Sequence, residues 1–223
     1  MKRRLIFVIC LSLILMQVTC MTCSAKAEIE KPIKRIALTF DDGPHPRQSR
    51  QIMDVLDRYQ IKATFFVIGV NAKNYPGIVR EELERGHEIG NHTNTHSHAS
   101  RLDPEAMKDQ ILACEQEIFL QTEEKVKLFR PPEGAMNEDM KTLIKELGYT
   151  NVLWSLDTRD WAHTPPEQIC DYVVTNAKNN DIVLMHDYIG YNSPTVDALE
   201  LMIPQLLERG FTFVTIGELL KQK

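Results

Sequence analysis

Short apolar runs alternate with longer amphipathic stretches along the chain from Ile33 onward. Brief apolar runs bounded by Gly, Pro, Asn or Asp are typical of strands, whereas apolar residues recurring every three or four positions are typical of helices. The pattern predicts strands at 33–40, 63–68, 87–90, 126–129, 151–156, 182–185 and 211–214. Between them it predicts helices at 48–59, 78–85, 104–122, 137–147, 165–176 and 194–209.

Several of the predicted helices have capping residues at their ends. Asp103 and Pro104 predict the start of the long helix, because Asp accepts hydrogen bonds from the first turn and Pro is tolerated there. Gly86, Gly148 and Gly210 follow the last apolar positions of three other helices, where glycine commonly ends a helix. These signals fix the helix ends more closely than periodicity does.

The order of the elements predicts the fold class. Strands that alternate with helices, without a hairpin signal, indicate a parallel sheet with helices outside it. No Gly-rich phosphate loop follows the first strand, and polar residues follow many strands, which favours a barrel or partial barrel over an open doubly wound sheet. We therefore expect an α/β protein with about seven parallel strands in one domain, 33–223.

The N-terminus has a different composition from the rest. Basic residues Lys2, Arg3 and Arg4 precede an apolar run at 5–18, and Ala25-Lys26-Ala27 offers a cleavage site, so 1–27 is predicted to be a signal peptide and 28–32 a short leader. The alternative, a membrane anchor, is disfavoured because a span needs about 20 apolar residues. We expect an exported protein, extracellular or associated with the cell wall, tethered to a membrane only if this segment is retained.

Composition and charge narrow the classes of partner. The 223 residues are 43% hydrophobic with a net charge of −5, which disfavours a nucleic-acid partner. Glu81, Glu82 and Glu84 are interpreted as the solvated face of a helix. Beyond the predicted signal peptide only Cys114 and Cys170 remain, too few for a disulfide scaffold, and the sequence leaves open whether they pair. We expect a monomer.

Polar residues capable of catalysis stand directly after five of the predicted strands. They are Asp41, Asp42, His92, His96, Arg130, Asp157, Asp160 and His186. In parallel β/α folds the carboxyl ends of the strands form one rim, where active sites lie. The positions of these residues therefore predict an active site at that rim.

His92, His96 and Asp42 could share a metal ion. Three residues separate the two histidines, which allows both imidazoles to lie on one side of a turn, and a carboxylate would complete a set with open coordination positions. Taken alone, the histidine spacing fits a surface turn better, and Asp-Asp-Gly-Pro is also common turn chemistry. What favours a functional site is a pair of adjacent carboxylates at the end of a buried strand.

His186 has two interpretations. A single histidine beside an apolar strand is usually a core residue with its hydrogen bonds satisfied. Its position at the same rim as Asp41 and Asp42 favours a role as an acid. Tyr188 and Tyr191 follow it in a predicted loop and are candidates for stacking on a sugar.

Five segments, in order, resemble the motifs of the polysaccharide deacetylases of carbohydrate esterase family 4, the NodB-homology domain. They are Thr39-Phe40-Asp41-Asp42-Gly43-Pro44, His92-Thr93-Asn94-Thr95-His96, Arg130-Pro131-Pro132-Glu133-Gly134, Asp157-Thr158-Arg159-Asp160-Trp161 and Leu184-Met185-His186. The similarity extends over about 33–220. It implies a distorted (β/α) barrel and a metal-dependent hydrolase that acts on an N-acetylated polysaccharide.

The resemblance also implies roles for individual residues. Asp42, His92 and His96 would hold one divalent metal, with zinc favoured and cobalt, nickel or manganese as alternatives. Asp41 would be the general base and His186 the general acid. Arg130 would hold Asp41 ionised and aimed, and Asp160 would do the same for the His186 imidazolium.

Substrate-binding roles fall on the third, fourth and fifth motifs. Pro132, Gly134 and Leu184 would line the site, and a backbone N–H near Gly134 would bind the oxyanion. Trp161 would line the acetyl pocket, with a core tryptophan as the alternative. Many members have an aromatic residue where this chain has Glu133, which affects the wall of the pocket.

The expected function is removal of N-acetyl groups from peptidoglycan N-acetylglucosamine. The C-terminal part, 184–220, looks most like members that act on peptidoglycan. Chitin-oligosaccharide deacetylase and acetylxylan esterase are alternatives within the family, because the acetyl chemistry is shared. An inactive glycan-binding protein is disfavoured, because base, acid and metal ligands are all present. A non-haem iron oxygenase could use the same ligand set but is disfavoured, because it would have no use for Asp41, Arg130 and His186.

Overall fold

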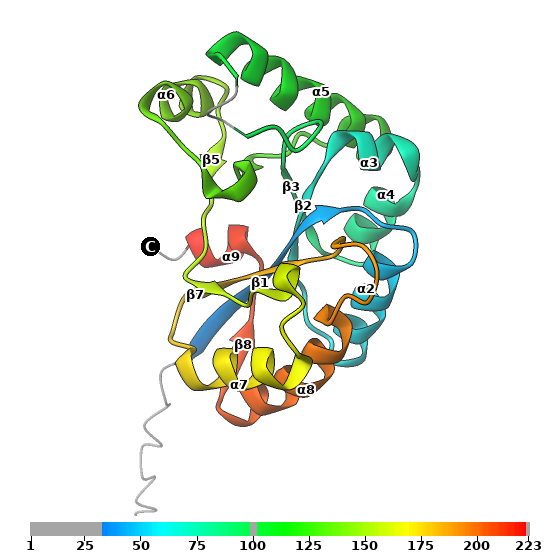
Figure 1. Cartoon of the computed structure of the whole chain (residues 1–223), viewed down its shortest axis with the longest axis vertical. Coiled ribbons are helices and arrows are strands. Elements are labelled where there is room, and N and C mark those ends of the chain that lie inside the picture. Colours follow the sequence, from blue (N-terminus) through cyan, green and yellow to red (C-terminus); the bar gives the residue numbers. More distant parts are fainter. Residues whose placement is uncertain (1–32, 99–101, 222–223) are drawn as a thin grey trace, which may run out of the picture. The chain divides into compact units, whose positions relative to one another are not determined.

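The computed structural model describes residues 33–98 and 102–221, which form one α/β unit (Figure 1). The predicted signal peptide, 1–27, and leader, 28–32, lie outside the described residues. Within the described ranges no helix has both the length and the apolarity needed to cross a membrane.

One parallel sheet contains all the strands of the described residues. In order along the sheet they are β5 (Thr150–Asn151), β4 (Leu128–Phe129), β3 (Glu88–Asn91), β2 (Thr64–Val67), β1 (Lys34–Gly43), β7 (Asp181–His186) and β6 (Leu156–Asp157), with β8 (Phe211–Phe213) paired to β1. The central strand β1 pairs with β7 along one edge, and its other edge is shared by β8 at Lys34–Ile36 and β2 at Thr39–Gly43. The predicted distorted (β/α) barrel with about seven parallel strands is confirmed.

One prediction needs correction, because the strand expected at 151–156 is broken in two. Its first part, β5, pairs with β4, and its last part, β6, pairs with β7. Between them the Val152 N–H donates to Phe129 O (2.9 Å) and the Ser155 N–H donates to Ile182 O (2.9 Å). The segment leaves one edge of the sheet and joins the other, so it spans the gap in the barrel. The pattern of apolar residues does not indicate where a segment changes its pairing strand.

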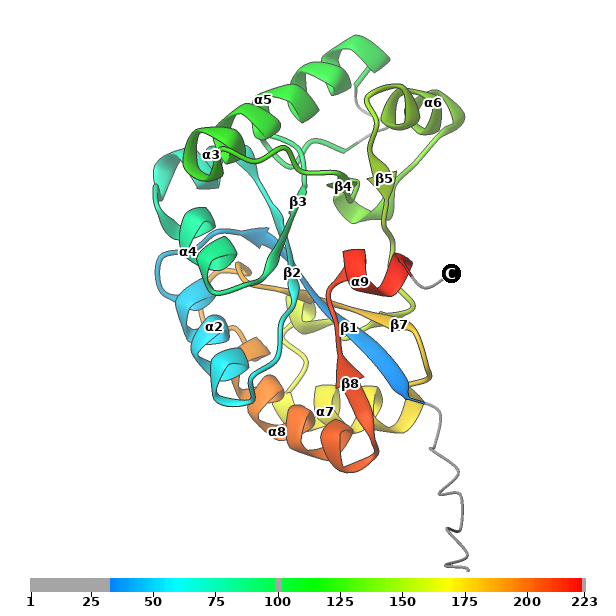
Figure 2. The ribbon, with the colours of Figure 1, turned by 180° about the vertical axis from the view of Figure 1, so that it is seen from behind.

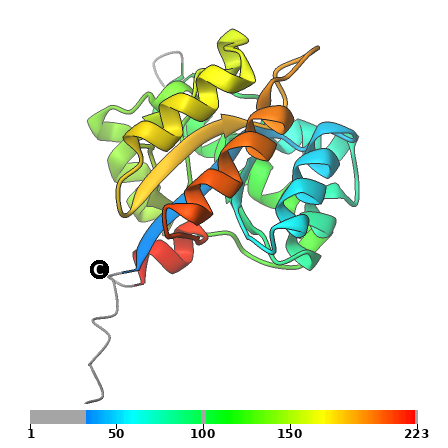
Figure 3. The same cartoon turned by 90° about the horizontal axis from the view of Figure 1, so that it is seen from below.

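Helices cover the outside of the sheet. Those predicted appear as α2 (Gln48–Arg58), α4 (Ile78–Glu84), α5 (Pro104–Thr122), α6 (Glu138–Glu146), α7 (Pro166–Asn176) and α8 (Thr195–Glu208). Asp103 Oδ1 accepts from the Ala106 N–H (2.8 Å), so the predicted cap of α5 is confirmed. Figure 3 shows α7 and α8 side by side across the sheet. Two further helices, α3 (Gly69–Asn74) and α9 (Ile216–Leu220), were not predicted, because they are too short for a periodicity signal.

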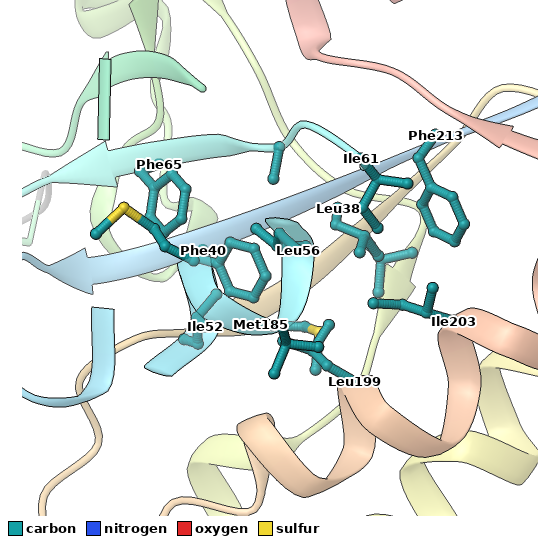
Figure 4. Close-up of a cluster of buried hydrophobic side chains, with 14 of the residues drawn as sticks. Leu38, Phe40, Ile52, Leu56, Ile61, Phe65, Met185, Leu199, Ile203 and Phe213 are labelled. Atoms are coloured by element: carbon teal, nitrogen blue, oxygen red, sulfur yellow. The ribbon is translucent and has the colours of Figure 1, made fainter. Parts of the chain in front are cut away.

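The two faces of each strand have different environments. On β1, Ile36, Leu38 and Phe40 face the helices and form the main core with α2 and α8 (Figure 4). Side chains alternate along a strand, so Ala37, Thr39 and Asp41 face the barrel interior. The same alternation on β7 directs Leu184 and His186 inward, since Val183 and Met185 belong to the outer core. Polar residues at the carboxyl ends of these strands therefore meet inside the barrel.

The amino-terminal end of the barrel is closed by apolar packing. Ile216 and Leu219 of α9 contact an interior cluster that includes Ala37, Phe66 and Leu128. Figure 2 shows α9 beside β1. Hydrogen bonds fix the helix there, because the Ile216 N–H donates to Thr64 Oγ1 (3.0 Å) and the Gly217 N–H to Glu88 Oε2 (2.8 Å).

Both cysteines in the described residues, Cys114 and Cys170, are buried and free. This settles the question that the sequence left open, because they do not form a disulfide with each other.

Glu82 corrects the prediction of a solvated acidic face on α4. Its side chain is fully buried, and neither carboxylate oxygen has a hydrogen-bond partner among the described residues. Burial raises the pKa of Glu82 well above its ordinary value, and the charge of Asp187 adds to the shift. Asp187 is buried as well; burial raises its pKa to about 7, although Ser49 Oγ donates to its Oδ2 (2.5 Å). Burial thus makes both carboxyls hold a proton to higher pH than exposed carboxyls do.

The Glu82→Gln variant should lose less stability than the wild type as the pH rises. Glu82 has a higher pKa in the folded state than its unfolded value of 4.5, so its contribution to stability is present below pH 4.5 and is lost as the pH rises. If the pKa is higher by one in the folded state than in the unfolded state, the difference corresponds to about 1.4 kcal/mol of folding free energy. Thermal unfolding of wild type and Glu82→Gln at acidic and mildly alkaline pH measures the difference. Glu84→Gln, which removes an exposed carboxylate from the same helix, is the control; equal effects of the two variants would contradict the prediction.

Candidate active site at the carboxyl ends of the strands

The carboxyl ends of β1, β3, β4 and β7 bring the predicted site residues together. Asp41, His92, Arg130 and Asp160 are buried, whereas Asp42, His96 and His186 are partly exposed. Asp157 lies at the edge of this group, where its Oδ1 accepts from the Arg159 N–H (2.9 Å). The sequence therefore identified side chains that share one end of the barrel.

A β-bulge directs both carboxylates of β1 toward this end. Asp41 pairs with Phe66 of β2 but Gly43 pairs with the next residue, Val67, so Asp42 is the extra residue. Asp42 has a φ of 74°, in the left-handed region. In a regular strand adjacent side chains would point to opposite faces. Here Asp41 Oδ2 lies 3.8 Å and Asp42 Oδ1 3.5 Å from the same His92 Nε2.

Asp42, His92 and His96 have the donor set and spacing of a metal site. One ligand atom from each lies within 4.8 Å of the others, and His96 Nε2 is 3.3 Å from Asp42 Oδ1. His92 Nδ1 lies 2.7 Å from Arg130 O, which places its N–H there and leaves the Nε2 lone pair free. Asp42 Oδ1 is buried with no hydrogen-bond partner among the described residues. A divalent cation would satisfy this oxygen and both imidazoles.

The charges around this trio favour a cation. Burial lowers the pKa of His92, but the carboxylates of Asp41 and Asp42 raise it above its ordinary value. Burial raises the pKa of Asp42, but His92 and His96 lower it below its ordinary value. The field that favours a proton on His92 also favours a metal ion in its place.

Arg130 fixes the position of Asp41. Its guanidinium is fully buried, and Nη1 donates to Asp41 Oδ1 (2.7 Å) and Thr39 Oγ1 (2.8 Å). Nε donates to Val152 O (3.2 Å), and the guanidinium lies over the Phe66 ring at 4.1 Å. The pair leaves the other oxygen of Asp41 directed toward the trio.

His186, which is partly exposed, pairs with the buried Asp160. His186 Nδ1 lies 2.8 Å from Asp160 Oδ1, and Asp160 Oδ2 accepts from the His186 N–H (2.7 Å) and from Thr195 Oγ1 (2.8 Å). Burial lowers the pKa of His186, but Asp160, with the charges of Asp41 and Asp42, raises it to about 9. His186 therefore holds a proton at neutral pH.

The predicted substrate-binding residues have different environments. Pro132 is buried at the start of a short 3-10 turn, η2 (Pro132–Gly134), and a side chain on Gly134 (φ 67°) would press on the Trp154 ring. Leu184 is buried in β7. Trp161, in a second such turn, η3 (Asp160–Ala162), is 49% exposed, which excludes the alternative of a core tryptophan.

Comparison with known proteins identifies the family to which the chain belongs. A family model described as polysaccharide deacetylase matches residues 28–152, more than half of the sequence. The chain belongs to the polysaccharide deacetylase family. The resemblance inferred from the five motifs is thus confirmed.

Several known proteins are similar to this polysaccharide deacetylase over most of its length. A peptidoglycan-N-acetylglucosamine deacetylase of Bacillus cereus is 44% identical over 198 residues, which cover 88% of this chain and 92% of the relative. A chitooligosaccharide deacetylase of Sinorhizobium fredii is 35% identical over 187 residues, covering 79% and 87%. The structure of the peptidoglycan deacetylase PdaC from Bacillus subtilis superposes with a TM-score of 0.79 at 33% identity, covering 85% of this chain and 91% of PdaC.

Three residues of the deacetylase site were missed in the sequence analysis. Thr39 accepts from Arg130 and donates to Val183 O (2.7 Å), and strand alternation from Asp41 could have identified it. Thr195 holds Asp160 from the first turn of α8, far away in the chain, with no local signal. Asp187 lies behind Asp41, since its N–H donates to Asp41 O (3.1 Å) and its carboxylate occupies the space beside Gly43.

Replacing His96 or Asp42 with Ala should weaken zinc binding by at least about tenfold, because each change removes one ligand of the trio. Calorimetric titration of the chelator-treated protein with zinc measures the affinity. His163→Ala, which removes an exposed imidazole outside the trio, is the control. Unchanged affinity in His96→Ala would place the ion elsewhere.

Proposed function

We propose that this polysaccharide deacetylase removes N-acetyl groups from N-acetylglucosamine in peptidoglycan and releases acetate. The observation that carries the proposal is the arrangement of the site. A metal-ligand trio is combined with a separate buried carboxylate, Asp41, and a partly exposed proton donor, His186. The Bacillus relatives, which are named as peptidoglycan deacetylases, support the choice of substrate.

Asp42, His92 and His96 would hold one divalent ion, and we propose zinc, with cobalt, nickel and manganese as alternatives. A bound ion supplies two effects there, polarisation of the acetamide carbonyl and a lowered pKa of the attacking water. His92 would also fix the position of the ion, because its Nδ1 is held 2.7 Å from Arg130 O.

Asp41 acts as the general base. One of its oxygens is bound to Arg130 (2.7 Å), so the carboxylate cannot rotate, and the other faces the trio at 3.8 Å from His92 Nε2. A water between that oxygen and the acetamide carbon would lose its proton to Asp41 as it attacks. Arg130 donates a charged hydrogen bond to this carboxylate and holds it in the orientation needed for proton transfer.

His186 acts as the general acid. An amine is a poor leaving group unless it is protonated, and His186 is a proton donor whose Nδ1 is occupied by Asp160 (2.8 Å). Its Nε2 is therefore the atom that gives the proton. Asp160 then stabilises the same tautomer and orientation throughout the reaction.

The oxyanion donor falls on Glu133 and not on Gly134. The Gly134 N–H donates to Pro131 O (2.9 Å) and the Ala135 N–H to Pro132 O (3.1 Å), both within the turn. We assign the oxyanion to the Glu133 N–H, whose residue has a φ of 57°. Leu184, Pro132 and Trp161 complete the proposed walls for the acetyl group and sugar.

The enzyme is proposed to work outside the cell as a monomer. Residues 1–27 would direct export as a signal peptide, 28–32 would form a leader, and 33–223 would act on the cell wall. Chitin oligosaccharides and acetylated xylan are the alternative substrates, and the chitooligosaccharide deacetylase relative favours the first of these.

Zinc-loaded protein should release acetate from peptidoglycan faster than from chitin oligomers or acetylated xylan, and a chelator should abolish the release. Acetate measured from the three polymers side by side tests the proposal. A preference for chitin oligomers or xylan would replace the proposed substrate. No release from any polymer, with zinc verified in the protein, would favour an inactive glycan-binding protein.

Asp41→Asn and His186→Ala should each lower kcat by at least about a hundredfold, because each removes one proton-transfer group. Zinc binding should be retained, since neither residue belongs to the trio. Acetate release combined with zinc content separates the two effects. Full activity in either variant would refute the assigned role.

Asp160→Asn should move the alkaline limb of the pH profile of kcat toward lower pH. His186 gives a proton only when protonated, and without the Asp160 charge its pKa should fall from about 9 toward the ordinary 6.5. Activity near pH 8 should then drop roughly tenfold, with a smaller loss at acidic pH. A uniform loss at every pH would show a purely structural role for Asp160.

A further inference from the structure

A groove lies beside the proposed active site, at the same end of the barrel. Its volume is about 1160 Å³, and its lining includes His45, Gln51, His163, Tyr188, Tyr191 and Asn192. Gln51 belongs to α2, and the other five come from three loops, which follow β1, β6 and β7. We call this feature the tyrosine groove.

The three loops connect the tyrosine groove to the proposed catalytic residues. His45 follows Asp42 by three residues, His163 follows Asp160 by three, and Tyr188 follows His186 by two. Three residues of chain span at most about 11 Å. Each of the three loops therefore places a groove residue a short distance along the chain from a residue of the proposed site.

Two tyrosine rings are presented to solvent in the tyrosine groove. Tyr191 is 94% exposed, and Tyr188 is 43% exposed. The Tyr188 ring stacks on His45, with ring centres 5.0 Å apart and planes inclined by 18°, and His45 in turn contacts the edge of Tyr75. Tyr188 is thus supported on one side by other rings. Rigid amphipathic rings of this kind bind ligands at a low entropic cost.

The polar lining suits an uncharged ligand. Gln51 and Asn192 offer amide donors and acceptors, and the charged residues are one of each sign, Arg47 and Asp197. Burial and the charge of Arg47 lower the pKa of His45, so its imidazole is neutral at pH 7. A ligand with hydroxyl and amide groups on a ring that has an apolar face fits this combination.

We infer that the tyrosine groove is an additional subsite that binds a further sugar unit of the same glycan strand, by stacking on Tyr188 and Tyr191. The inference rests on the proposed function. It implies that the enzyme recognises a strand and not a single acetylated sugar. Binding energy from this distant unit would lower KM for long substrates.

The test uses zinc-loaded full-length protein and chitin oligomers from the dimer to the hexamer, which carry no peptide. In wild type, kcat/KM should rise with length. In Tyr191→Ala and Tyr188→Ala the gain from dimer to hexamer should shrink, roughly fivefold to tenfold, through KM and not kcat. Tyr191→Phe, which keeps the ring, should retain the gain. Tyr172→Ala, which removes an exposed tyrosine of α7 outside the groove, is the control.

Binding measurements separate failure of this inference from failure of the proposed function. Hexamer affinity, measured by calorimetry on Asp41→Asn protein with and without Tyr191→Ala, reports the subsite without turnover. Equal affinity and an unchanged length dependence would overturn the inference while leaving the deacetylase activity intact. If the tyrosine variants lost activity on peptide-bearing peptidoglycan alone, the groove would bind the peptide, which also overturns it. Absence of acetate release from every substrate would instead refute the proposed function.

Discussion

The buried ion pair between Arg130 and Asp41 is the interaction on which the arrangement of the site depends. A buried guanidinium needs a partner for its charge, and here Asp41 pairs with Nη1, Thr39 and Val152 O accept further hydrogen bonds, and the Phe66 ring lies against the plane. The backbone of the same residue accepts from His92. Arg130 thereby couples β4 to β1 and β3, and it holds the proposed base, Asp41, and one proposed metal ligand, His92, next to each other. Loss of this residue would leave an unpaired carboxylate inside the barrel.

Environment gives the carboxyls of this region different charge states. Burial raises the pKa of Asp42, but the His92 and His96 imidazoles that it faces lower it below its ordinary value. Glu82 has no hydrogen-bond partner among the described residues, and it lies near Asp187, so burial favours its protonated form. The raised pKa values of Glu82 and Asp187 reduce the negative charge that these two carboxyls place near Asp41 and Asp42. Sequence alone makes all of these side chains look equivalent.

Strand alternation explains how much of the site was predictable. Asp41, His186 and Arg130 each stand at the inward-facing parity of a strand whose other residues define the core, so their convergence follows from the strand predictions and a parallel fold. Asp42 does not follow this rule, because the bulge depends on how β1 pairs with β2. The break of 151–156 and the burial of Glu82 likewise depend on partners distant in the chain. Local patterns predict what a segment forms; they do not predict a change of neighbour.

The hydrogen bonds that already hold the site residues limit where the substrate can be anchored. Asp41, His92, Asp160 and His186 are already bound to protein partners, and each is needed in one orientation for the proposed proton transfers. Contacts strong enough to anchor a polymer on these groups would compete with those orientations. Binding energy from groups away from the reacting bond can position it without disturbing them. Trp161, Tyr188 and Tyr191 have exposed rings in the segments that follow β6 and β7, and such rings can supply that energy. In the proposed function, recognition would then fall on the loops and chemistry on the strand ends.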